Sequence, residues 1–426
     1  MMKIAVIGGT GLLGSAIVAD LSSRGHSVIS MSRSAGVASS EAISIDLNKA
    51  TSPSYWLPHL DGVEAVVNCA GVLQDSPNDS TSMVHHRGIA TLFAACEQLK
   101  IRRVIHFSAI GVDRQTPSDF SRTKLLGDKA LMECDLDWII LRPSVVIGRA
   151  AYGASALMRG LAALPALPVM PNTGELQIVL LEDVLRTVEH FLDPGAPKRK
   201  IIEVVGPHRY AFLEVVALIR RWCRWPPARE IHLPEFASSV MYKFGDMISL
   251  LGWRPPVRST AEREIRRGAV GNLEDTQQLG LHPKGLPEFF ASEPASVQER
   301  WFARMYLLKP AIFVILSLFW ISTAFVSLGP GWDYGVGLMR EGGVEGVSAS
   351  LTVIAGALSD LAIGLAIAYR PTSRYGLYAA IVISFTYAII GTILVPRLWA
   401  DPLGPMLKIW PIIVLHFAAL AILDDR

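Results

Sequence analysis

Charged side chains are scarce in this sequence of 426 residues. Asp, Glu, Lys and Arg make up 18% of the chain, against about 25% in ordinary soluble domains. A wholly soluble or disordered protein is therefore disfavoured. The net charge is only +2, so the sequence lacks the basic excess that is typical of nucleic-acid-binding proteins. We expect no nucleic-acid partner.

Cysteine is also rare. The four cysteines show no CxxC or other metal-binding spacing, and they are Cys69, Cys96, Cys134 and Cys223. We therefore predict reduced thiols and no metal site. The apolar stretch before Gly8 is too short for the core of a signal peptide, which predicts that the first domain stays in the cytoplasm.

The last part of the chain holds even fewer charges, with 13 of the 78 charged side chains in residues 310–426. Four apolar stretches occur there, at 310–328, 348–369, 375–396 and 406–423. Each is close to the roughly 20 residues that a helix needs to cross a bilayer. We predict four transmembrane helices. The alternative, a set of buried helices in a large soluble protein, is disfavoured because the stretches exceed buried-core lengths.

Basic residues near the ends of these stretches predict their orientation. Six lie on the side of the N-terminal domain, namely Arg300, Arg304, Lys309, Arg370, Arg374 and Arg426, and three lie opposite, namely Arg340, Arg397 and Lys408. Because positive charge favours the cytoplasmic side, we predict a multi-pass protein of the inner cell membrane with a cytoplasmic N-terminal domain.

Two ionisable residues lie inside the predicted spans, Asp360 in the second and His416 in the fourth. A charge at that depth is costly unless it is paired or hydrated, so each is a candidate site residue. If the two side chains face each other, they could bind a polar head group such as a quinone ring or relay a proton. Alternatively, each makes an interhelical hydrogen bond that fixes the packing, with Asp360 protonated because burial disfavours its charge.

A glycine-rich turn follows the first apolar segment of the chain. Residues 3–7 (KIAVI) predict a buried strand, residues 8–14 read GGTGLLG, and an amphipathic helix is expected from Leu12 to Arg24. Glycines in this context allow a tight turn and let a pyrophosphate approach the N-terminus of the helix. A dinucleotide site is favoured over a purely structural turn.

The second predicted strand, His26–Met31, is followed by Ser32 and Arg33. A site that selects NAD usually carries Asp or Glu here for the ribose hydroxyls, whereas Arg suits the 2′-phosphate of NADP. We therefore predict NADP(H) in preference to NAD(H). The alternative is a solvated surface arginine.

Further strands and helices alternate along the first half of the chain. Strands are expected at 42–45, 65–68, 103–107 and 138–141, with helices at 89–99 and 124–133. This alternation predicts an α/β fold with a doubly wound parallel sheet of Rossmann type. We expect a core at 1–150, a small α/β substrate lobe at 151–295, and an all-α four-span bundle at 296–426.

The chain resembles the atypical or extended short-chain dehydrogenase/reductases over about residues 1–290. The motifs that carry this resemblance are GGTGLLG at 8–14, IDL at 45–47, NCAG at 68–71, FSAIG at 107–111, FSRTK at 120–124 and LRPSVVIG at 141–148. With its four spans and the segment VQERW at 297–301, the chain is similar to bacterial proteins that fuse such a domain to a DoxX-like membrane module. It is also similar to the reductase-fold subunit of respiratory complex I.

The resemblance implies where a dinucleotide would bind. It implies a phosphate loop that contains Gly8, Thr10, Gly11, Leu12, Leu13 and Gly14. It further implies that Asp46 and Leu47 flank the adenine, that Cys69, Ala70 and Gly71 pass beneath the coenzyme, and that Pro143 and Val146 border the nicotinamide.

The catalytic pattern of this family is incomplete here. Its Tyr-x-x-x-Lys motif is represented by Phe120 and Lys124, so the phenol that usually acts as general acid and base is missing. The family places a substrate-polarising hydroxyl at Ser108 and a ribose-binding ammonium at Lys124, which remain the candidate catalytic residues. Alternatively, Ser108 caps a turn and Lys124 is a solvated helix residue. We interpret His85 as a packing or surface histidine.

Two functions are consistent with these residues. The first is an oxidoreductase in which NADPH passes hydride to a lipophilic acceptor such as a quinone, without the usual tyrosine. The second is a non-catalytic, NADPH-binding structural or sensing subunit that scaffolds a membrane complex with a partner protein. The apolar segment 151–170 would suit a lipid-like acceptor, although ordinary packing gives the same pattern. Residues 226–256, which contain Trp253 and follow directly on Trp225, could lie against the bilayer.

Overall fold

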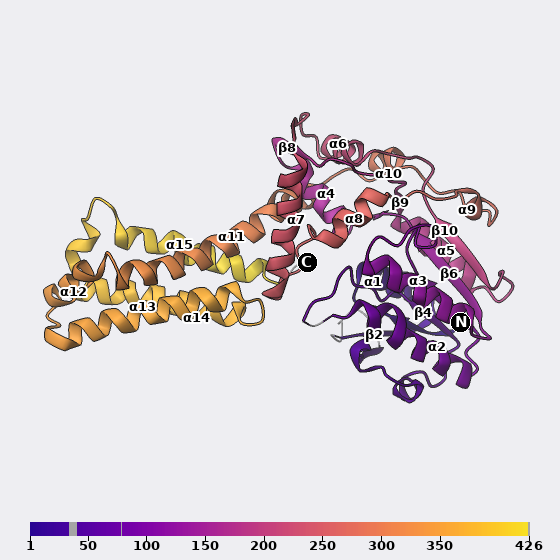
Figure 1. The fold of residues 1–426 in the computed structure, drawn as a ribbon, viewed down its shortest axis with the longest axis horizontal. Helices are drawn as coiled ribbons and strands as arrows, with labels where there is room; N and C mark the ends of the chain where they lie inside the picture. The colour runs from indigo at the N-terminus through magenta and orange to yellow at the C-terminus, as the bar shows by residue number, and fades with distance from the viewer. Residues whose placement is uncertain (34–40, 78, 425–426) are drawn as a thin grey trace. The chain divides into compact units, whose positions relative to one another are not determined.

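The computed structural model describes residues 1–33, 41–77 and 79–424. Two compact units make up the chain (Figure 1). The first holds Met1–Asp246 and Pro255–Ala303, and the second holds Met247–Arg254 and Arg304–Arg426. Arg426, one of the residues that predict orientation, lies outside the described residues.

A parallel sheet of seven strands forms the centre of the first unit, in the order β10-β6-β5-β4-β1-β2-β3. The strands are β1 (Lys3–Ile7), β2 (Ser27–Ser32), β3 (Glu41–Ser44), β4 (Ala65–Asn68), β5 (Arg103–Phe107), β6 (Asp137–Pro143) and β10 (Lys200–Val204). Because the chain runs outward from β1 in one direction and then returns to start again at β4, the strand order reverses between these two strands. Such a switch point is where doubly wound sheets bind ligands. The predicted Rossmann-type sheet is confirmed.

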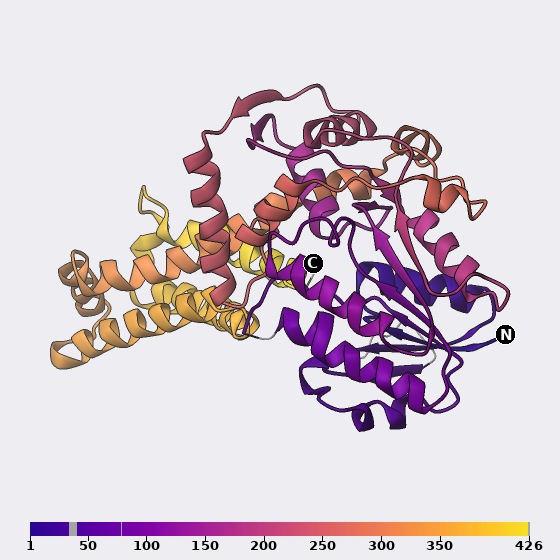
Figure 2. The same cartoon turned by 45° about the vertical axis from the view of Figure 1, so that its right-hand side comes forward.

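Helices cover both faces of this sheet (Figure 2). Helices α1 (Leu12–Ser23) and α5 (Leu181–Leu192) contribute to one buried core, together with Ile4 and Val6 of β1. Helix α2 (Gly88–Gln98) contributes to the other, which contains Ala5 and Ile7. Since alternate residues of β1 enter opposite cores, the strand needs an uninterrupted apolar sequence.

The rest of the first unit is built from short elements. Two small parallel sheets pair β7 (Val146–Ile147) with β9 (Val179–Leu180) and β8 (Ala166–Val169) with β11 (Arg229–His232). The helices are α3 (Asp119–Met132), α4 (Gly153–Ala162), α6 (Phe212–Trp222), α7 (Glu235–Leu250, whose last four residues belong to the second unit), α8 (Ser259–Arg267), α9 (Glu274–Gln277) and α10 (Leu286–Ser292). There are also three short 3-10 helices, η1 (Leu47–Lys49), η2 (Pro53–Tyr55) and η3 (Leu57–His59), and one short π-helix, η4 (Met83–Arg87). The apolar segment 151–170 forms α4 and β8, and its Leu157, Met158 and Leu161 are buried.

Four helices of the second unit are long and apolar enough to cross a membrane. They are α11 (Val297–Leu328), α13 (Gly346–Ala368), α14 (Ser373–Leu394) and α15 (Pro405–Ile422), connected in part by α12 (Trp332–Glu341) and η5 (Pro396–Trp399). The predicted spans are confirmed, but α11 begins well before the apolar stretch at 310. The Glu299 carboxylate accepts a hydrogen bond of 2.7 Å from the Ser296 N–H, as in a capping box that starts a helix.

Charged residues gather at the ends of the four-helix bundle. Arg370 and Arg374 both pair with Asp424, and Lys309 Nζ donates to the carbonyl oxygen of Leu423 at 3.4 Å. Arg397 forms a two-point ion pair with Glu341, with N–O distances of 2.5 and 2.6 Å. Arg370, Arg374 and Lys309 therefore lie together at one end of the bundle, which is the placement predicted from the positions of the basic residues in the sequence.

Candidate coenzyme-binding site

The predicted coenzyme residues lie where the strands of the large sheet end. Gly8 follows β1, Arg33 follows β2, Cys69 follows β4 and Ser108 follows β5. The ends of β1, β2 and β4 lie side by side, since Ile7 lies opposite both Met31, next to the last residue of β2, and Asn68. The sheet therefore brings the four loops to one edge, at the switch point beside β1.

Neighbouring backbone atoms leave room only for glycine at Gly8 and Gly14 in the turn after β1. Gly8 has a φ of +80°, and an added Cβ would lie 2.9 Å from the Ala70 nitrogen. At Gly14, an added Cβ would lie 2.1 Å from the Gly8 carbonyl oxygen. Both glycines thus allow the turn to fold tightly between β1, the β4 loop and the first turn of α1.

The N-terminus of α1 is open toward this turn. Its N-cap residue, Gly11, makes no side-chain cap, and the first turn holds no acidic residue. The first helical N–H groups, at Leu12, Leu13 and Gly14, have no intrahelical acceptor by the geometry of a helix. With the positive end of the helix dipole, they suit a pyrophosphate. Thr10 is exposed beside them. These residues fit a dinucleotide.

The expected 2′-phosphate residue, Arg33, already has an anionic partner. Its Nη1 lies 2.6 Å from Asp79 Oδ1, and the Asp79 side chain is only 5% exposed whereas that of Arg33 is 41% exposed. Ser32 is half-buried in the last position of β2. The pair therefore holds the guanidinium at the end of β2, and a phosphate there would share or displace Asp79.

The residues expected beside the adenine lie in the turn after β3. Asp46 is the N-cap of η1, and its Oδ1 accepts a hydrogen bond of 3.0 Å from the Asn48 N–H. Its own N–H donates to the Tyr55 hydroxyl at 3.0 Å. Leu47 is half-buried and packs on one of the cores. This turn is thus fixed by its own hydrogen bonds.

Lys124 ties the ends of β4 and β5 together. Its ammonium donates to the carbonyl oxygens of Phe107, at 2.8 Å, and Ala70, at 3.2 Å. The side chain is buried, and burial lowers the pKa of the Lys124 ammonium to about 8. An added Cβ on Gly71 would lie 3.5 Å from its Nζ. The solvated alternative is therefore wrong, and Lys124 lies directly under the Cys69–Gly71 loop.

This buried ammonium predicts a pH dependence of stability. A lysine in an unfolded chain has a pKa of about 10.4, and the pKa of folded Lys124 is about 8. Between these values the unfolded chain binds more protons, so Lys124 adds stability as the pH rises through this window. We expect the difference in Tm between the native protein and Lys124→Met to grow in favour of the native protein across this range. A constant difference would show that Lys124 keeps its proton.

Ser108 donates its hydroxyl hydrogen away from the predicted substrate side. Its Oγ lies 2.9 Å from Asp128 Oδ2, and the same carboxylate accepts from Arg142 Nη2 at 2.9 Å. Burial raises the pKa of Asp128, while Arg142 and Ser108 act in the opposite direction. In this arrangement, Ser108 can accept a hydrogen bond from a ligand but has no second hydrogen to donate.

A buried polar network continues from Asp128 and was not predicted. His106 Nε2 lies 3.6 Å from Asp128 Oδ1, and His106 Nδ1 accepts from the Asn68 side-chain amide at 2.8 Å. Burial holds the pKa of His106 well below its usual range, so this histidine is neutral. One feature of the sequence could have indicated this network: Lys124 and Asp128 are four residues apart, which places both on one face of α3.

Phe120 packs against a histidine instead of offering a proton. Its ring stands edge-on to His85, with ring centroids 5.5 Å apart. His85 Nε2 accepts from the Val72 N–H at 3.0 Å, and Nδ1 lies 2.9 Å from the Thr123 hydroxyl. Burial holds the pKa of His85 well below its usual range. His85 is therefore a buried packing residue whose two ring nitrogens are both engaged.

The two residues expected at the nicotinamide continue from β6. Pro143 ends β6, is half-buried, and accepts a hydrogen bond of 3.2 Å from the Ile110 N–H. Val146 starts β7 and packs partly buried on the core that contains α1. Both belong to the segment that leaves the carboxyl edge of the sheet.

Asp360 and His416 do not contact each other in the membrane unit. The Tyr387 hydroxyl donates to Asp360 Oδ1 at 2.9 Å. The Trp320 indole N–H donates to His416 Nε2 at 2.9 Å, and His416 Nδ1 lies 2.7 Å from the Ile412 carbonyl oxygen. Both nitrogens of His416 are thus used in packing, whereas Asp360 has a single side-chain partner among the described residues.

Comparisons with known proteins match two separate parts of the chain, one in each compact unit. Residues 8–160 match a family described as NAD(P)H-binding, and residues 317–417 match the DoxX-like family. The photosystem II assembly factor Ycf39 of Synechocystis sp. is 24% identical over 231 residues, which cover 52% of this chain and 67% of that protein. The mitochondrial 40 kDa subunit of NADH-ubiquinone oxidoreductase from Neurospora crassa is 22% identical over 294 residues, or 67% of this chain and 76% of that one.

Solved structures give the same fold. The Bordetella bronchiseptica enzyme WbmG, in complex with NAD, is 15% identical and aligns with a TM-score of 0.54 over 71% of this chain and 96% of its own. The first unit therefore contains an NAD(P)-binding Rossmann fold like that of short-chain dehydrogenase/reductases, and the second contains a DoxX-like domain of a multi-pass membrane protein.

Proposed function

We propose that this chain, an NAD(P)-binding Rossmann domain of short-chain dehydrogenase/reductase type joined to a DoxX-like membrane domain, is an NADPH-dependent oxidoreductase with a lipophilic acceptor such as a quinone. The observation that carries this proposal is the open glycine turn at the N-terminus of α1 together with Phe120 at the position of the usual phenol. The turn supports coenzyme binding. The phenylalanine limits which acceptors can react.

The missing phenol favours a quinone over an aldehyde or ketone. When bound, the coenzyme supplies hydride, so that NADPH, a quinone and one proton give NADP⁺ and a hydroquinone. Reduction of an ordinary carbonyl forms a strongly basic alkoxide, which needs an acid beside it. A hydroquinone anion is a phenolate, and a phenol has a pKa of about 10. Water can therefore protonate it without an enzyme-borne acid.

We assign the following positions to the residues of this site. Leu12, Leu13 and Gly14 bind the pyrophosphate through their N–H groups, and Lys124 and the Cys69–Gly71 loop lie under the nicotinamide ribose. Ser108 offers only an acceptor to the ligand, because its hydrogen goes to Asp128. Pro143 and Val146 border the nicotinamide ring. The Phe120 ring, which stands edge-on to His85, offers no proton to a quinone.

Arg33 is assigned to the 2′-phosphate of NADPH. A charge-assisted hydrogen bond contributes about 1.5–3 kcal/mol, so Arg33→Ala should weaken NADPH binding about tenfold or more while changing NADH binding little. Calorimetric titration of both coenzymes measures this. Equal losses for the two coenzymes would contradict the assignment, and Asp79→Asn serves as the matched control because it keeps Arg33 and removes its competitor.

We infer the placement of the chain in the cell from its charges. Arg370, Arg374 and Lys309 lie at one end of the bundle, and we assign this end to the cytoplasmic face of an inner membrane. The coenzyme domain would then meet cytoplasmic NADPH. The relative named as a subunit of NADH-ubiquinone oxidoreductase also supports a membrane partner protein for this chain.

The acceptor is testable with the full chain in lipid nanodiscs. We expect NADPH oxidation with membrane-soluble quinones and none above background with water-soluble aldehydes. Oxidation is followed by nicotinamide absorbance without oxygen, and empty nanodiscs give the background. Tight NADPH binding without oxidation by any quinone would instead support the non-catalytic, ligand-holding subunit.

A further inference from the structure

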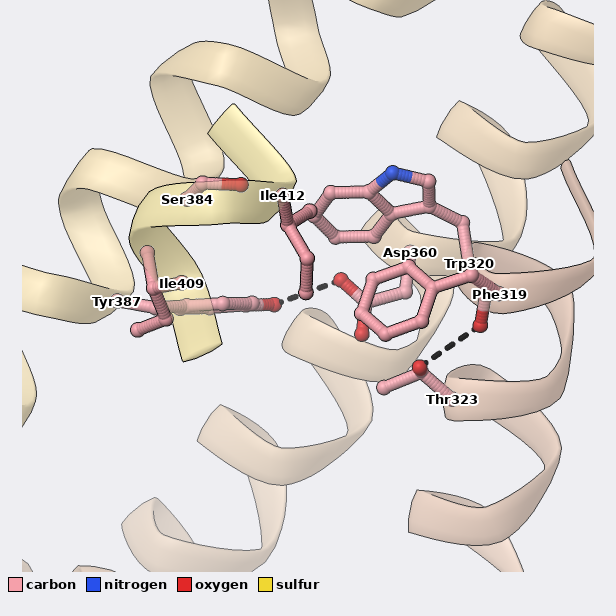
Figure 3. Close-up of a pocket in the computed structure, with 8 residues that line it drawn as sticks. All are labelled: Phe319, Trp320, Thr323, Asp360, Ser384, Tyr387, Ile409 and Ile412. Atoms are coloured by element: carbon pink, nitrogen blue, oxygen red, sulfur yellow. Dashed lines mark hydrogen bonds between the residues drawn. The ribbon is translucent and has the colours of Figure 1, made fainter. Parts of the chain in front are cut away.

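A small cavity lies among α11, α13, α14 and α15 in the membrane unit (Figure 3). Its volume is about 80 Å³, and its polar lining comes from Thr323, Asp360, Ser384 and Tyr387. The aromatic rings of Phe319 and Trp320 also line the cavity. Figure 3 shows the Asp360 carboxylate between the Tyr387 hydroxyl and these two rings.

Every side-chain donor in this lining already donates within the protein. The hydroxyl of Tyr387 donates to Asp360, that of Thr323 to the Phe319 carbonyl oxygen at 2.8 Å, and that of Ser384 to the Ala380 carbonyl oxygen at 2.7 Å. The Trp320 N–H donates to His416. Toward the cavity, the three hydroxyls present only lone pairs, and the indole N–H is already used.

The Asp360 carboxylate lies among acceptors and has few hydrogen-bond donors, which makes its ionised form unfavourable. The residue is 3% exposed, and among the described residues only Tyr387 hydrogen-bonds to its carboxylate, through Oδ1. The same part of the chain gives it no salt bridge. An ionised carboxylate at this depth requires a donor or a cation, because the bilayer supplies neither. The cavity is thus chemically complementary to a donor.

We propose that this cavity binds the hydroxyl edge of a lipid-soluble aromatic diol, a hydroquinone, in preference to the corresponding quinone. A hydroquinone hydroxyl donates a hydrogen bond to Asp360 Oδ2, whereas a quinone carbonyl can only accept and meets lone pairs. The choice of a hydroquinone rests on the proposed function, since that is the product of quinone reduction. The preference for a donor rests on the lining alone.

The size of the cavity limits how much of the ligand enters. A cavity of about 150 Å³ is known to hold benzene, so we expect a space of about 80 Å³ to take a hydroxyl and one edge of a ring. Phe319 is 38% exposed and lines the same cavity. The remainder of the ring would stack against Phe319 in the lipid phase.

The test is equilibrium binding of decylhydroquinone and decylquinone to the full chain in nanodiscs, without NADPH and without oxygen. We expect the native protein to bind the reduced form about tenfold more tightly, as one hydrogen bond to a carboxylate predicts. Asp360→Asn, which keeps the shape of the side chain, should bring the ratio close to one. Ser359→Ala on the neighbouring position of α13 should leave it unchanged.

Several outcomes would overturn the proposal: equal affinity of the native protein for both forms, an unchanged ratio in Asp360→Asn, no binding above empty nanodiscs, or equally tight binding of the dimethyl ether of the hydroquinone. Tyr387→Phe provides a second variant, because it removes a donor to Asp360 and should increase the preference for the reduced form. Since the assay contains no NADPH, it stands even if the chain oxidises no coenzyme. Turnover without discrimination between the two forms would refute only this inference.

Discussion

Gly11→Asp is expected to abolish coenzyme binding without destabilising the fold. Gly11 is the N-cap of α1, with φ −75° and ψ 174°, a conformation open to any residue. An added Cβ would have one close neighbour, the Gly8 carbonyl oxygen at 3.3 Å. Aspartate is among the preferred N-cap residues, and its charge interacts favourably with the helix dipole.

The same carboxylate would lie where we place the pyrophosphate. Two like charges about 4 Å apart repel by about 1 kcal/mol in water and about 4 kcal/mol near a protein surface, and the helix amides would bind the new side chain instead. Together these effects exceed about 3 kcal/mol, or a loss of more than about 100-fold in affinity. Calorimetry with NADPH measures the expected loss of affinity, and a thermal unfolding curve measures the expected unchanged stability.

The control for Gly11→Asp is Ser22→Asp. Ser22 is exposed near the other end of α1, so the substitution adds the same charge to the same helix away from the turn. It should leave the affinity for NADPH within about twofold, because exposed charges more than about 10 Å apart are largely screened by salt. Normal binding by Gly11→Asp would mean that the coenzyme does not lie on this turn.

Phe120→Tyr is expected to create an aldehyde reductase activity, which we expect to be absent from the native protein. Phe120 and Lys124 are one turn apart on α3, so they share a face of that helix. The Lys124 ammonium, whose pKa is about 8, would stabilise the phenolate and make the new hydroxyl a better acid. A positioned acid contributes on the order of 100-fold or more. We expect NADPH-dependent reduction of para-nitrobenzaldehyde to appear.

Two variants separate this explanation from a general change of the cleft. Phe120→Leu removes the ring without adding a hydroxyl and should stay inactive toward the aldehyde. Phe120→Tyr combined with Lys124→Met should lose most of the gain. If Phe120→Tyr binds NADPH normally yet reduces no aldehyde, the side chain at position 120 does not face the reacting carbon. The proposal that the missing phenol decides which acceptors react would then be wrong.

The sequence predicts those parts of the site that depend on local patterns. An apolar strand followed by GGTGLLG and an amphipathic helix fixes β1, the turn and α1, because each element carries its own signal. The four transmembrane helices follow from length and hydropathy in the same way. The early start of α11 was missed although Ser296 and Glu299 form a recognisable capping box.

Contacts between distant segments could not be predicted in this way. Asp79 pairs with Arg33 across a loop that no periodicity describes. The buried network joins Asn68, His106 and Asp128 from β4, β5 and α3, and each residue alone looks like an ordinary polar position. The separation of Asp360 from His416 depends on helix rotation within the bundle, which a four-helix pattern leaves open.

The most direct test of the account is a single turnover of the full chain in nanodiscs, loaded with NADPH and mixed with decylquinone without oxygen. The account predicts that one bound NADPH is oxidised per protein as one hydroquinone forms, and that deuterium at the transferred position slows the reaction. Two results would contradict the account. One is that bound NADPH stays in its reduced form, and the other is that deuterium leaves the rate of oxidation unchanged under conditions in which hydride transfer limits the rate.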